Sequence, residues 1–449
     1  MTNSRLQAVA DGELDVKWAR LALRNSYRVR MKMGLFDPAP NPYKNIGTDE
    51  VGSAAHQEMS LNAALKGMVL LKRGGLPFPK GKRIAVVGNA VSDPMLMTGN
   101  YNGPLCPGPH PKGRNPAGSA DCWPSIGEAV AASNTAGTTT VVAGTSEANV
   151  SAAVAAVKGA DFTVLVIDNF ADGGGEGHDR ATIGLAGAQL TLATAVLAAA
   201  TPSNSVVLVT LSGGLISLDG LKESAPAILS AGMPGVHGGP AIASTVFGGN
   251  NPGGKLPVTM YHSNYTSQVE FLNMSMVNGV GRSYKYYTGT PLFPFGFGLS
   301  FTEFDLRWAA PPLAHVTVIS VASASTNYSV SVTNIGKVLG DEVVLAFTVP
   351  KAHTLRGSLG PTVPIEQKRL FGFQRVALDA GASVTLSFEL TPAHLAMVNQ
   401  DGHTALHNGE FSVVFTRGHG SELVAHAAVQ LVAGASEEQA RVKTFHKWW

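Results

Sequence analysis

The stretch Phe162-Thr-Val-Leu-Val-Ile-Asp-Asn-Phe-Ala-Asp-Gly-Gly-Gly-Glu-Gly-His-Asp-Arg180 joins a run of aliphatic residues to a glycine-rich loop. A buried parallel strand reads as such an apolar run, and functional loops follow the carboxyl ends of these strands. Glu176 has glycine on both sides, so little side-chain bulk surrounds its carboxyl group. A glutamate in this setting can serve as a general acid if its surroundings hold a proton on it near neutral pH.

The same loop also has a purely structural interpretation, in which the glycines turn the chain and Glu176 is solvated. A phosphate-binding loop is disfavoured by the spacing. His178 stands where G-x-G-x-x-G needs its last glycine, and no Gly-Lys-Ser/Thr follows. The rest of the chain has to decide between a catalytic and a structural loop.

Length and composition indicate a globular protein of two or three domains. The chain has 449 residues, of which 45% are hydrophobic and 14% are charged. Its formal net charge is +2, and no basic stripe is present. Charge therefore gives no support for nucleic-acid binding.

The two cysteines, Cys106 and Cys122, lie in a segment rich in proline and glycine that also holds His110. A zinc site needs four suitable ligands, and this segment offers three at most, so no metal is expected. The pair is compatible with a disulfide in a secreted protein and equally with two free thiols.

Two segments bear on membranes and export. The first residues, Met1 to Arg5, are not followed by an apolar core, so no signal peptide is predicted. No charged residue occurs between Ala181 and Leu218, but Pro202 divides this stretch. A buried helix followed by a buried strand accounts for it better than a membrane span.

Periodicity predicts an α/β region with a mostly parallel sheet over residues 83–262. Apolar spacing predicts helices over 14–33 and 53–71 before it. Strands then alternate with helices, which is typical of α/β layers. The strands are expected at 83–87, 139–143, 162–167, 206–211 and 227–230, and the helices at 148–157, 186–200 and 239–247.

The pattern changes after the α/β region. Residues 263–304 are dense in glycine, proline and aromatic residues and are expected to form an irregular connector. Beyond them the helical period disappears, and short apolar or alternating segments predict a β-sandwich over residues 305–435. Four of its strands are expected at 327–333, 342–349, 383–390 and 410–416.

Five motifs in the same order give the chain a resemblance to a known family. They are Arg28–Asp37, Gly67–Lys72 followed by Leu76-Pro77, Glu176–Arg180, Asn251–Pro257 and Phe293–Ser300. Together they resemble the C-terminal two-thirds of glycoside hydrolase family 3, in its β-xylosidase-like branch. The resemblance implies an α/β sandwich and a fibronectin type III-like domain, preceded by the end of a TIM-like barrel.

The resemblance assigns roles to parts of the chain. Residues 1–40 match the remnant of the barrel's end, and residues 41–82 match a linker and entry helix. Glu176 falls on the family's acid/base position. The family's nucleophile is an aspartate on the barrel, and Ser92-Asp93 followed by Pro94 fits neither its place nor its motif. The nucleophile is therefore assigned to no residue here, and a complete site is expected to need the missing barrel.

Members of this family are retaining exo-glycosidases that use neither metal nor organic cofactor. The segment Gly99–Gly103 resembles a loop of the xylosidase branch, which favours β-xylosides and makes Tyr101 a candidate sugar contact. The alternatives are a β-glucosidase or α-arabinofuranosidase of the same family, or a non-catalytic carbohydrate-binding or structural protein. The partner expected is an oligosaccharide or glycoside, with no nucleic acid and no membrane, and the branch implies a secreted protein.

Overall fold

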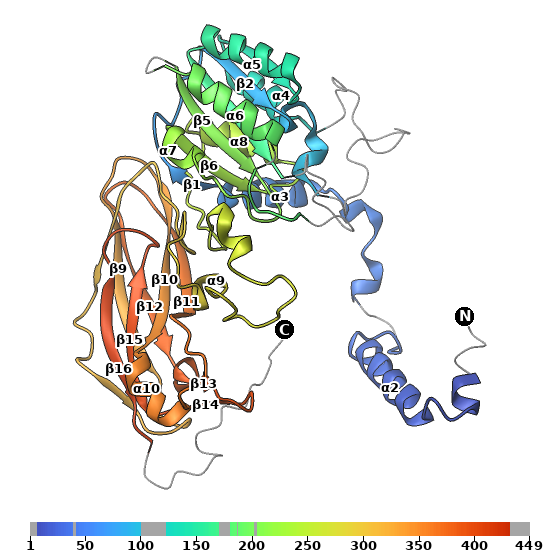
Figure 1. The fold of residues 1–449 in the computed structure, drawn as a ribbon, viewed down its shortest axis with the longest axis vertical. Coiled ribbons are helices and arrows are strands. Elements are labelled where there is room, and N and C mark those ends of the chain that lie inside the picture. The colour runs from blue at the N-terminus through green and yellow to red at the C-terminus, as the bar shows by residue number, and fades with distance from the viewer. Residues whose placement is uncertain are drawn as a thin grey trace. The chain divides into compact units, whose positions relative to one another are not determined.

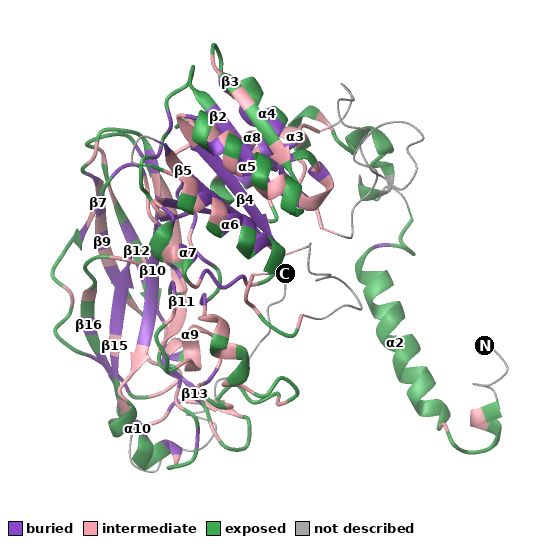
Figure 2. Ribbon diagram, turned by 45° about the horizontal axis from the view of Figure 1, so that its top comes forward, coloured by how far each residue is buried: buried purple, intermediate pink, exposed green. Residues whose placement is uncertain are grey.

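The computed structural model describes residues 7–38, 42–99, 123–169, 180–185, 187–201 and 204–431. Met1–Met59 and Ser60–Trp449 form separate compact units. The first unit contains helix α2 (Val16–Lys32), which begins at Asp15, whose side chain accepts a hydrogen bond from the Lys17 amide. None of the residues of α2 is buried (Figure 2). The helix predicted over 14–33 is confirmed, and its assignment to a barrel stays a prediction.

Six strands and their helices form an α/β module, which belongs to the second unit from Ser60 onward (Figure 1). The strands are β1 (Val69–Lys72), β2 (Arg83–Gly88), β3 (Thr138–Ala143), β4 (Phe162–Asp168), β5 (Ser205–Leu211) and β6 (Ala227–Gly232). The helices are α3 (Ala54–Gly67), α4 (Ile126–Ser133), α5 (Glu147–Gly159), α6 (Gly187–Ala199), α7 (Leu221–Ser224) and α8 (Gly238–Val246). The strand order is β1-β6-β5-β4-β2-β3, with β2 to β6 parallel and β1 antiparallel to β6. The mostly parallel sheet is confirmed.

Both faces of this sheet are covered, which explains the continuous apolar runs of its strands. Val164 and Val166 of β4 pack with α4 and α8 on one face, whereas Leu165 and Ile167 pack with α5 and α6 on the other. The charge-free segment after Ala181 contributes α6 and β5 to this core. Among the described residues, no helix has the length and the apolar run needed to cross a membrane.

The start of the sheet differs from the sequence prediction. The helix expected over 53–71 ends at Gly67, and Val69–Lys72 form β1 on β6. The sheet therefore begins inside the segment predicted as linker and entry helix. A short apolar run such as Met68 to Leu71 fits a buried helix and a buried strand equally well, so periodicity cannot separate them.

The β-sandwich is built from ten strands and helix α10 (Ala352–Leu359) among the described residues. Its sheets are β11-β10-β15-β16-β8, β12-β9-β7 and the pair β13-β14. The strands are β7 (Phe304–Trp308), β8 (Val316–Val318), β9 (Thr326–Asn334), β10 (Gly340–Pro350), β11 (Arg369–Leu378), β12 (Ser383–Leu390), β13 (Met397–Val398), β14 (Thr404–Ala405), β15 (Gly409–Thr416) and β16 (Leu423–Val429). The four predicted strands correspond to β9, β10, β12 and β15.

The connector predicted over residues 263–304 is irregular up to Phe304, where β7 begins, and it contains the short helices η6 (Ser263–Ser267) and α9 (Ser283–Tyr286). Its aromatic residues cover β10. Tyr284 stacks on Phe295 at 4.3 Å between ring centroids, and Phe347 of β10 lies 6.0 Å from Tyr284. Strand β10 is consequently buried on both faces and does not alternate between apolar and polar residues.

Two of the family-like motifs form the seam between the α/β module and the sandwich. The Asn251 side chain donates to the Leu339 carbonyl at 3.0 Å and accepts from the Phe301 amide at 2.8 Å. Lys255 forms a buried ion pair with Glu342 of β10, at 2.7 Å between Nζ and Oε1. These motifs therefore hold the two parts of the unit together.

Candidate functional site

The strand order places a switch point between β2 and β4. From β2 the chain proceeds to β3 on one side, and from β4 it proceeds to β5 and β6 on the other. Ligands of open α/β sheets bind in the crevice at such a point, beyond the carboxyl ends of the strands. Here Asn89 follows β2, and its amide donates to the Asp168 carboxylate at 3.2 Å. The buried Asp168 ends β4, so this pair marks the expected place of a ligand site.

Gln189 fixes the end of β4 from helix α6. Its side-chain oxygen accepts from the Asp168 amide at 2.9 Å, and its nitrogen donates to the Asp168 carbonyl at 2.6 Å. Gln189 is buried, so its side chain supplies the hydrogen bonds that water would otherwise make to the backbone of Asp168. The position from which the glycine-rich loop departs is thereby fixed. The sequence signal that could have indicated this role is a single glutamine within the otherwise apolar first turn of α6.

The residues predicted to act in the site, Glu176 and Tyr101, lie outside the described residues, as do Cys106 and Cys122. Their roles stay predictions. Among the described residues, no three His, Cys, Asp or Glu side chains are grouped so as to hold a metal ion.

Two segments that the structure does not describe contain Glu176 and Tyr101. The described residues that precede these segments lie at the carboxyl ends of the strands. A Cβ built at Gly99 would lie 2.7 Å from the Met233 Cε atom, and a Cβ built at Gly213 would also lie against the Met233 side chain. A Cβ at the adjoining Gly214 would lie 3.7 Å from the Asn169 amide nitrogen. The residues that lead into the two segments, Gly99 and Asn169, therefore lie close together near the carboxyl ends of β5 and β6.

A cavity of about 560 Å³ lies beside Arg180, the first described residue after the glycine-rich loop. Arg180 and Ile183 line it from that loop, and Leu215 lines it from the segment after β5. Tyr261 and Tyr265 line it from the chain before and within η6. We call this space the tyrosine cavity. Sequence reasoning missed both tyrosines, because their place beside the loop depends on contacts between distant segments.

An ionic contact at Asp219 holds the connector against the sheet. Its carboxylate accepts from the Ser263 amide and hydroxyl, each at 2.7 Å, and lies 2.5 Å from the His262 Nδ1 atom. Burial opposes ionisation of Asp219, but the hydrogen bonds from Ser263 and His262 outweigh it and lower its pKa to about 2. This contact fixes the start of the connector that carries Tyr265.

We expect Asp219→Asn to destabilise the chain by about 1 kcal/mol at pH 5 and to have a smaller effect as the pH falls toward 2. The pKa of Asp219 is lowered from 3.8 to about 2. Its carboxylate therefore stabilises the fold fully above pH 3.8, and this stabilisation is lost as the pH falls to about 2. The side chain is 37% exposed, and solvent screening keeps the effect small. Urea unfolding of both proteins from pH 5 to pH 3 measures the difference. A difference that stays constant with pH would contradict the ionic role.

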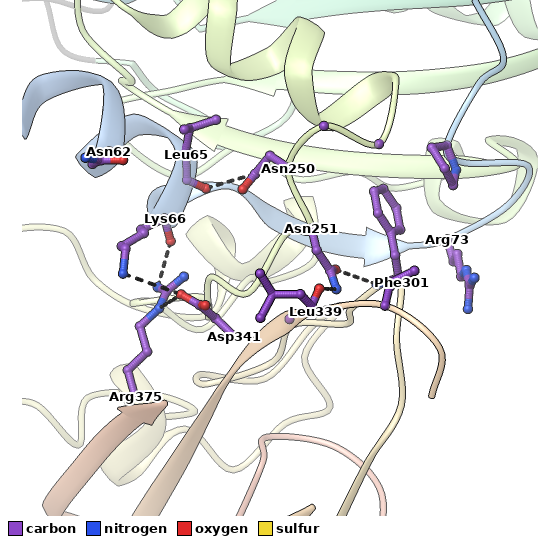
Figure 3. Close-up of a pocket in the computed structure, with 15 residues that line it drawn as sticks. Asn62, Leu65, Lys66, Arg73, Asn250, Asn251, Phe301, Leu339, Asp341 and Arg375 are labelled. Carbon is purple, nitrogen blue, oxygen red and sulfur yellow. Dashed lines mark hydrogen bonds and ion pairs between the residues drawn. The ribbon is translucent and has the colours of Figure 1, made fainter. Parts of the chain in front are cut away.

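A second cavity, of about 470 Å³, lies at the seam between the α/β module and the sandwich. Figure 3 shows Asp341 beside Lys66 and Arg375, with which it forms ion pairs of 3.7 Å and 2.7 Å. Asn250 donates to the Leu65 carbonyl at 3.2 Å. The ion pair between Asp341 and Lys66 joins the sandwich to the α/β module, so we interpret this cavity as part of the seam.

Comparison with known proteins identifies both parts of the unit. Residues 68–301 match the glycosyl hydrolase family 3 C-terminal domain, and residues 342–418 match a fibronectin type III-like domain. The chain is 34% identical to β-D-xylosidase 1 of Arabidopsis thaliana over 437 residues, which cover 90% of this chain and 54% of that relative. The chain thus spans about half the length of the curated relatives that it matches.

Solved structures share the fold at low sequence identity. A family 3 exo-β-xylosidase in complex with a xylobiose aziridine probe superposes with a TM-score of 0.75 at 24% identity, covering 89% of this chain and 52% of that one. A β-glucosidase from Listeria innocua in complex with isofagomine gives a TM-score of 0.74 at 24% identity, covering 95% and 57% of the two chains. The α/β module followed by a fibronectin type III-like sandwich is therefore confirmed.

Proposed function

The chain belongs to glycosyl hydrolase family 3, and from this membership we propose that it carries the acid/base half of the active site of a retaining exo-β-glycosidase. Glu176 is the proton donor. The observation that supports this role is the position of β4, whose carboxyl end lies at the switch point of the sheet and leads into the loop of Glu176.

The chemistry of a retaining glycosidase defines what Glu176 does. It protonates the glycosidic oxygen while the bond to the anomeric carbon breaks and a carboxylate nucleophile forms the glycosyl-enzyme. In the second step Glu176 takes a proton from the attacking water, and the sugar is released. The two carboxyl groups have to lie about 5–5.5 Å apart for this sequence of steps.

We assign the nucleophile to no residue of this sequence. Asp93 follows a serine, as the nucleophile of the family motif does, but its carboxylate caps the helix η4 (Pro94–Met97) by accepting from the Met95 amide at 3.0 Å. We propose that a carboxylate from a barrel outside these 449 residues completes the site.

The proposed substrates are β-xylosides of xylan-derived oligosaccharides, with Tyr101 as a sugar contact. The Arabidopsis relative supports this choice, because it is a β-D-xylosidase. A β-glucoside preference is the second candidate, favoured by the similarity in fold to the Listeria β-glucosidase. Because xylan is a polymer outside the cell, we also propose that the enzyme acts there.

We expect the 449-residue chain alone to hydrolyse 4-nitrophenyl β-D-xyloside no faster than buffer does, because no covalent intermediate forms without the nucleophile. Absorbance of released nitrophenolate measures this rate. Robust turnover by the chain alone would contradict the need for a further carboxylate.

The companion measurement uses a fusion protein. In it, this chain follows the portion of the Arabidopsis relative that the alignment leaves uncovered. We expect this fusion to hydrolyse the xyloside faster than the corresponding glucoside or arabinofuranoside. A folded fusion without activity on any of the three would favour a non-catalytic carbohydrate-binding protein instead.

A further inference from the structure

The tyrosine cavity has a rigid aromatic wall. The rings of Tyr261 and Tyr265 stack face to face, with centroids 3.8 Å apart and planes within 5°. Tyr287 packs edge-on against both, at 4.8 Å and 5.7 Å. The Tyr261 hydroxyl accepts from the Ser283 amide at 2.7 Å, and the Tyr265 hydroxyl donates to the Gly281 carbonyl at 3.2 Å. The backbone thus holds both rings in place.

Arg282 lines the same cavity and brings a polar group with unused bonding capacity. Its terminal Nη2 donates to the carbonyls of Glu270 and Asn273, each at 2.7 Å, and so holds the chain around Phe271. Its Nε atom is buried and has no hydrogen-bond partner among the described residues. A buried donor without a partner is costly, so the guanidinium group of Arg282 is not fully satisfied by the described residues.

Phe271 stands at the rim of the cavity. It lines the space, yet 78% of its surface is exposed. The neighbouring Leu272 and Met274 are 82% and 88% exposed and do not line it. An exposed phenylalanine at the mouth of an aromatic cavity is suited to contact a flat ligand that enters there.

We propose that the tyrosine cavity binds a sugar ring of a β-linked oligosaccharide, on the leaving-group side of the bond that is cleaved. The ring carbons of a sugar present apolar C–H faces to aromatic rings, and its hydroxyl oxygens accept from guanidinium groups such as those of Arg180 and Arg282, which line the cavity. An apolar ligand would cover the guanidinium groups of the cavity without pairing with them.

The position along the chain supports the leaving-group side. Arg180 lines the cavity and follows Glu176 by four residues, a length of chain that can span at most about 14 Å. The proton donor of a glycosidase acts on the oxygen that joins the two sugars, so the leaving sugar lies on its side of the bond. This placement rests on the function proposed above for Glu176.

Binding of xylotriose to the 449-residue chain, measured by isothermal titration calorimetry, tests the proposal. We expect saturable binding that Phe271→Ala weakens about fivefold, as expected for one aromatic contact. The matched control Leu272→Ala removes an equally exposed side chain outside the cavity and should leave the dissociation constant within about twofold. Circular dichroism verifies that both variants keep the fold.

The proposal is overturned if xylotriose does not bind, or if the two variants weaken binding equally. The measurement involves no turnover, so it is independent of the acid/base role. If Glu176 proves unimportant for hydrolysis while Phe271→Ala still weakens binding, the cavity remains a sugar site and the role of Glu176 fails.

Discussion

Replacement of Glu176 by glutamine is expected to lower kcat/KM for xylobiose by about 10²–10⁴-fold in the fusion that supplies the nucleophile. Glutamine keeps the size of the side chain but carries no proton for the leaving oxygen. A sugar alkoxide is a poor leaving group and needs that proton as the bond breaks. The steady-state rate of xylose release, followed over time by chromatography, measures the effect.

A series of aryl β-xylosides distinguishes loss of the acid from general damage. Dinitrophenolate leaves without protonation, so the first step of its xyloside should be nearly unaffected by Glu176→Gln, whereas unsubstituted phenyl xyloside should lose most of its rate. Asp172→Asn is the control, because it neutralises another carboxylate of the same glycine-rich loop. Equal losses along the series would argue against the acid/base role, and the same pattern for Asp172→Asn would move that role to Asp172.

Replacement of Glu342 by glutamine is expected to lower the free energy of unfolding by about 3–5 kcal/mol. The carboxylate is 2% exposed and lies 2.7 Å from Lys255 Nζ and 3.3 Å from Arg417 Nη1. Burial lowers the pKa of Lys255 and the charge of Glu342 opposes that shift, so the lysine depends on this partner to stay charged. Without it, a buried cation lacks its counter-charge.

Urea unfolding of the chain near pH 7 measures the loss. The control Glu410→Gln breaks the exposed ion pair with Lys351 and should change stability far less. Adding Lys255→Met to Glu342→Gln should recover part of the loss, because the uncompensated charge is then removed. If Glu342→Gln and Glu410→Gln have similar effects, the buried pair does not stabilise the seam.

Sequence patterns predicted the layers of the fold because both sheets bury regular apolar runs. The strands around Val164 and Val330 were found from their apolar residues alone. Strand β1 was missed, since Val69–Lys72 is too short for periodicity to separate a strand from the end of a helix.

The candidate site was less accessible to sequence reasoning. Glu176 and Tyr101 were proposed from their loops and stay predictions. The bond between Asn89 and Asp168 joins residues 79 positions apart, and the tyrosine cavity combines three separate segments. Such pairings depend on strand order, which local patterns do not contain. The partner of Lys255 was equally hidden, because Glu342 belongs to a different part of the unit.

The seam has a consequence for the descent of such proteins. Asn251 and Lys255 join the two halves of the unit, and Ser300 supports Asn251 by donating to it at 2.8 Å. Natural selection for a stable junction would preserve them in a lineage that had ceased to cleave sugars. The presence of these residues in a distant relative therefore indicates the shared fold. Whether that relative still cleaves sugars has to be judged from the residues that face the substrate.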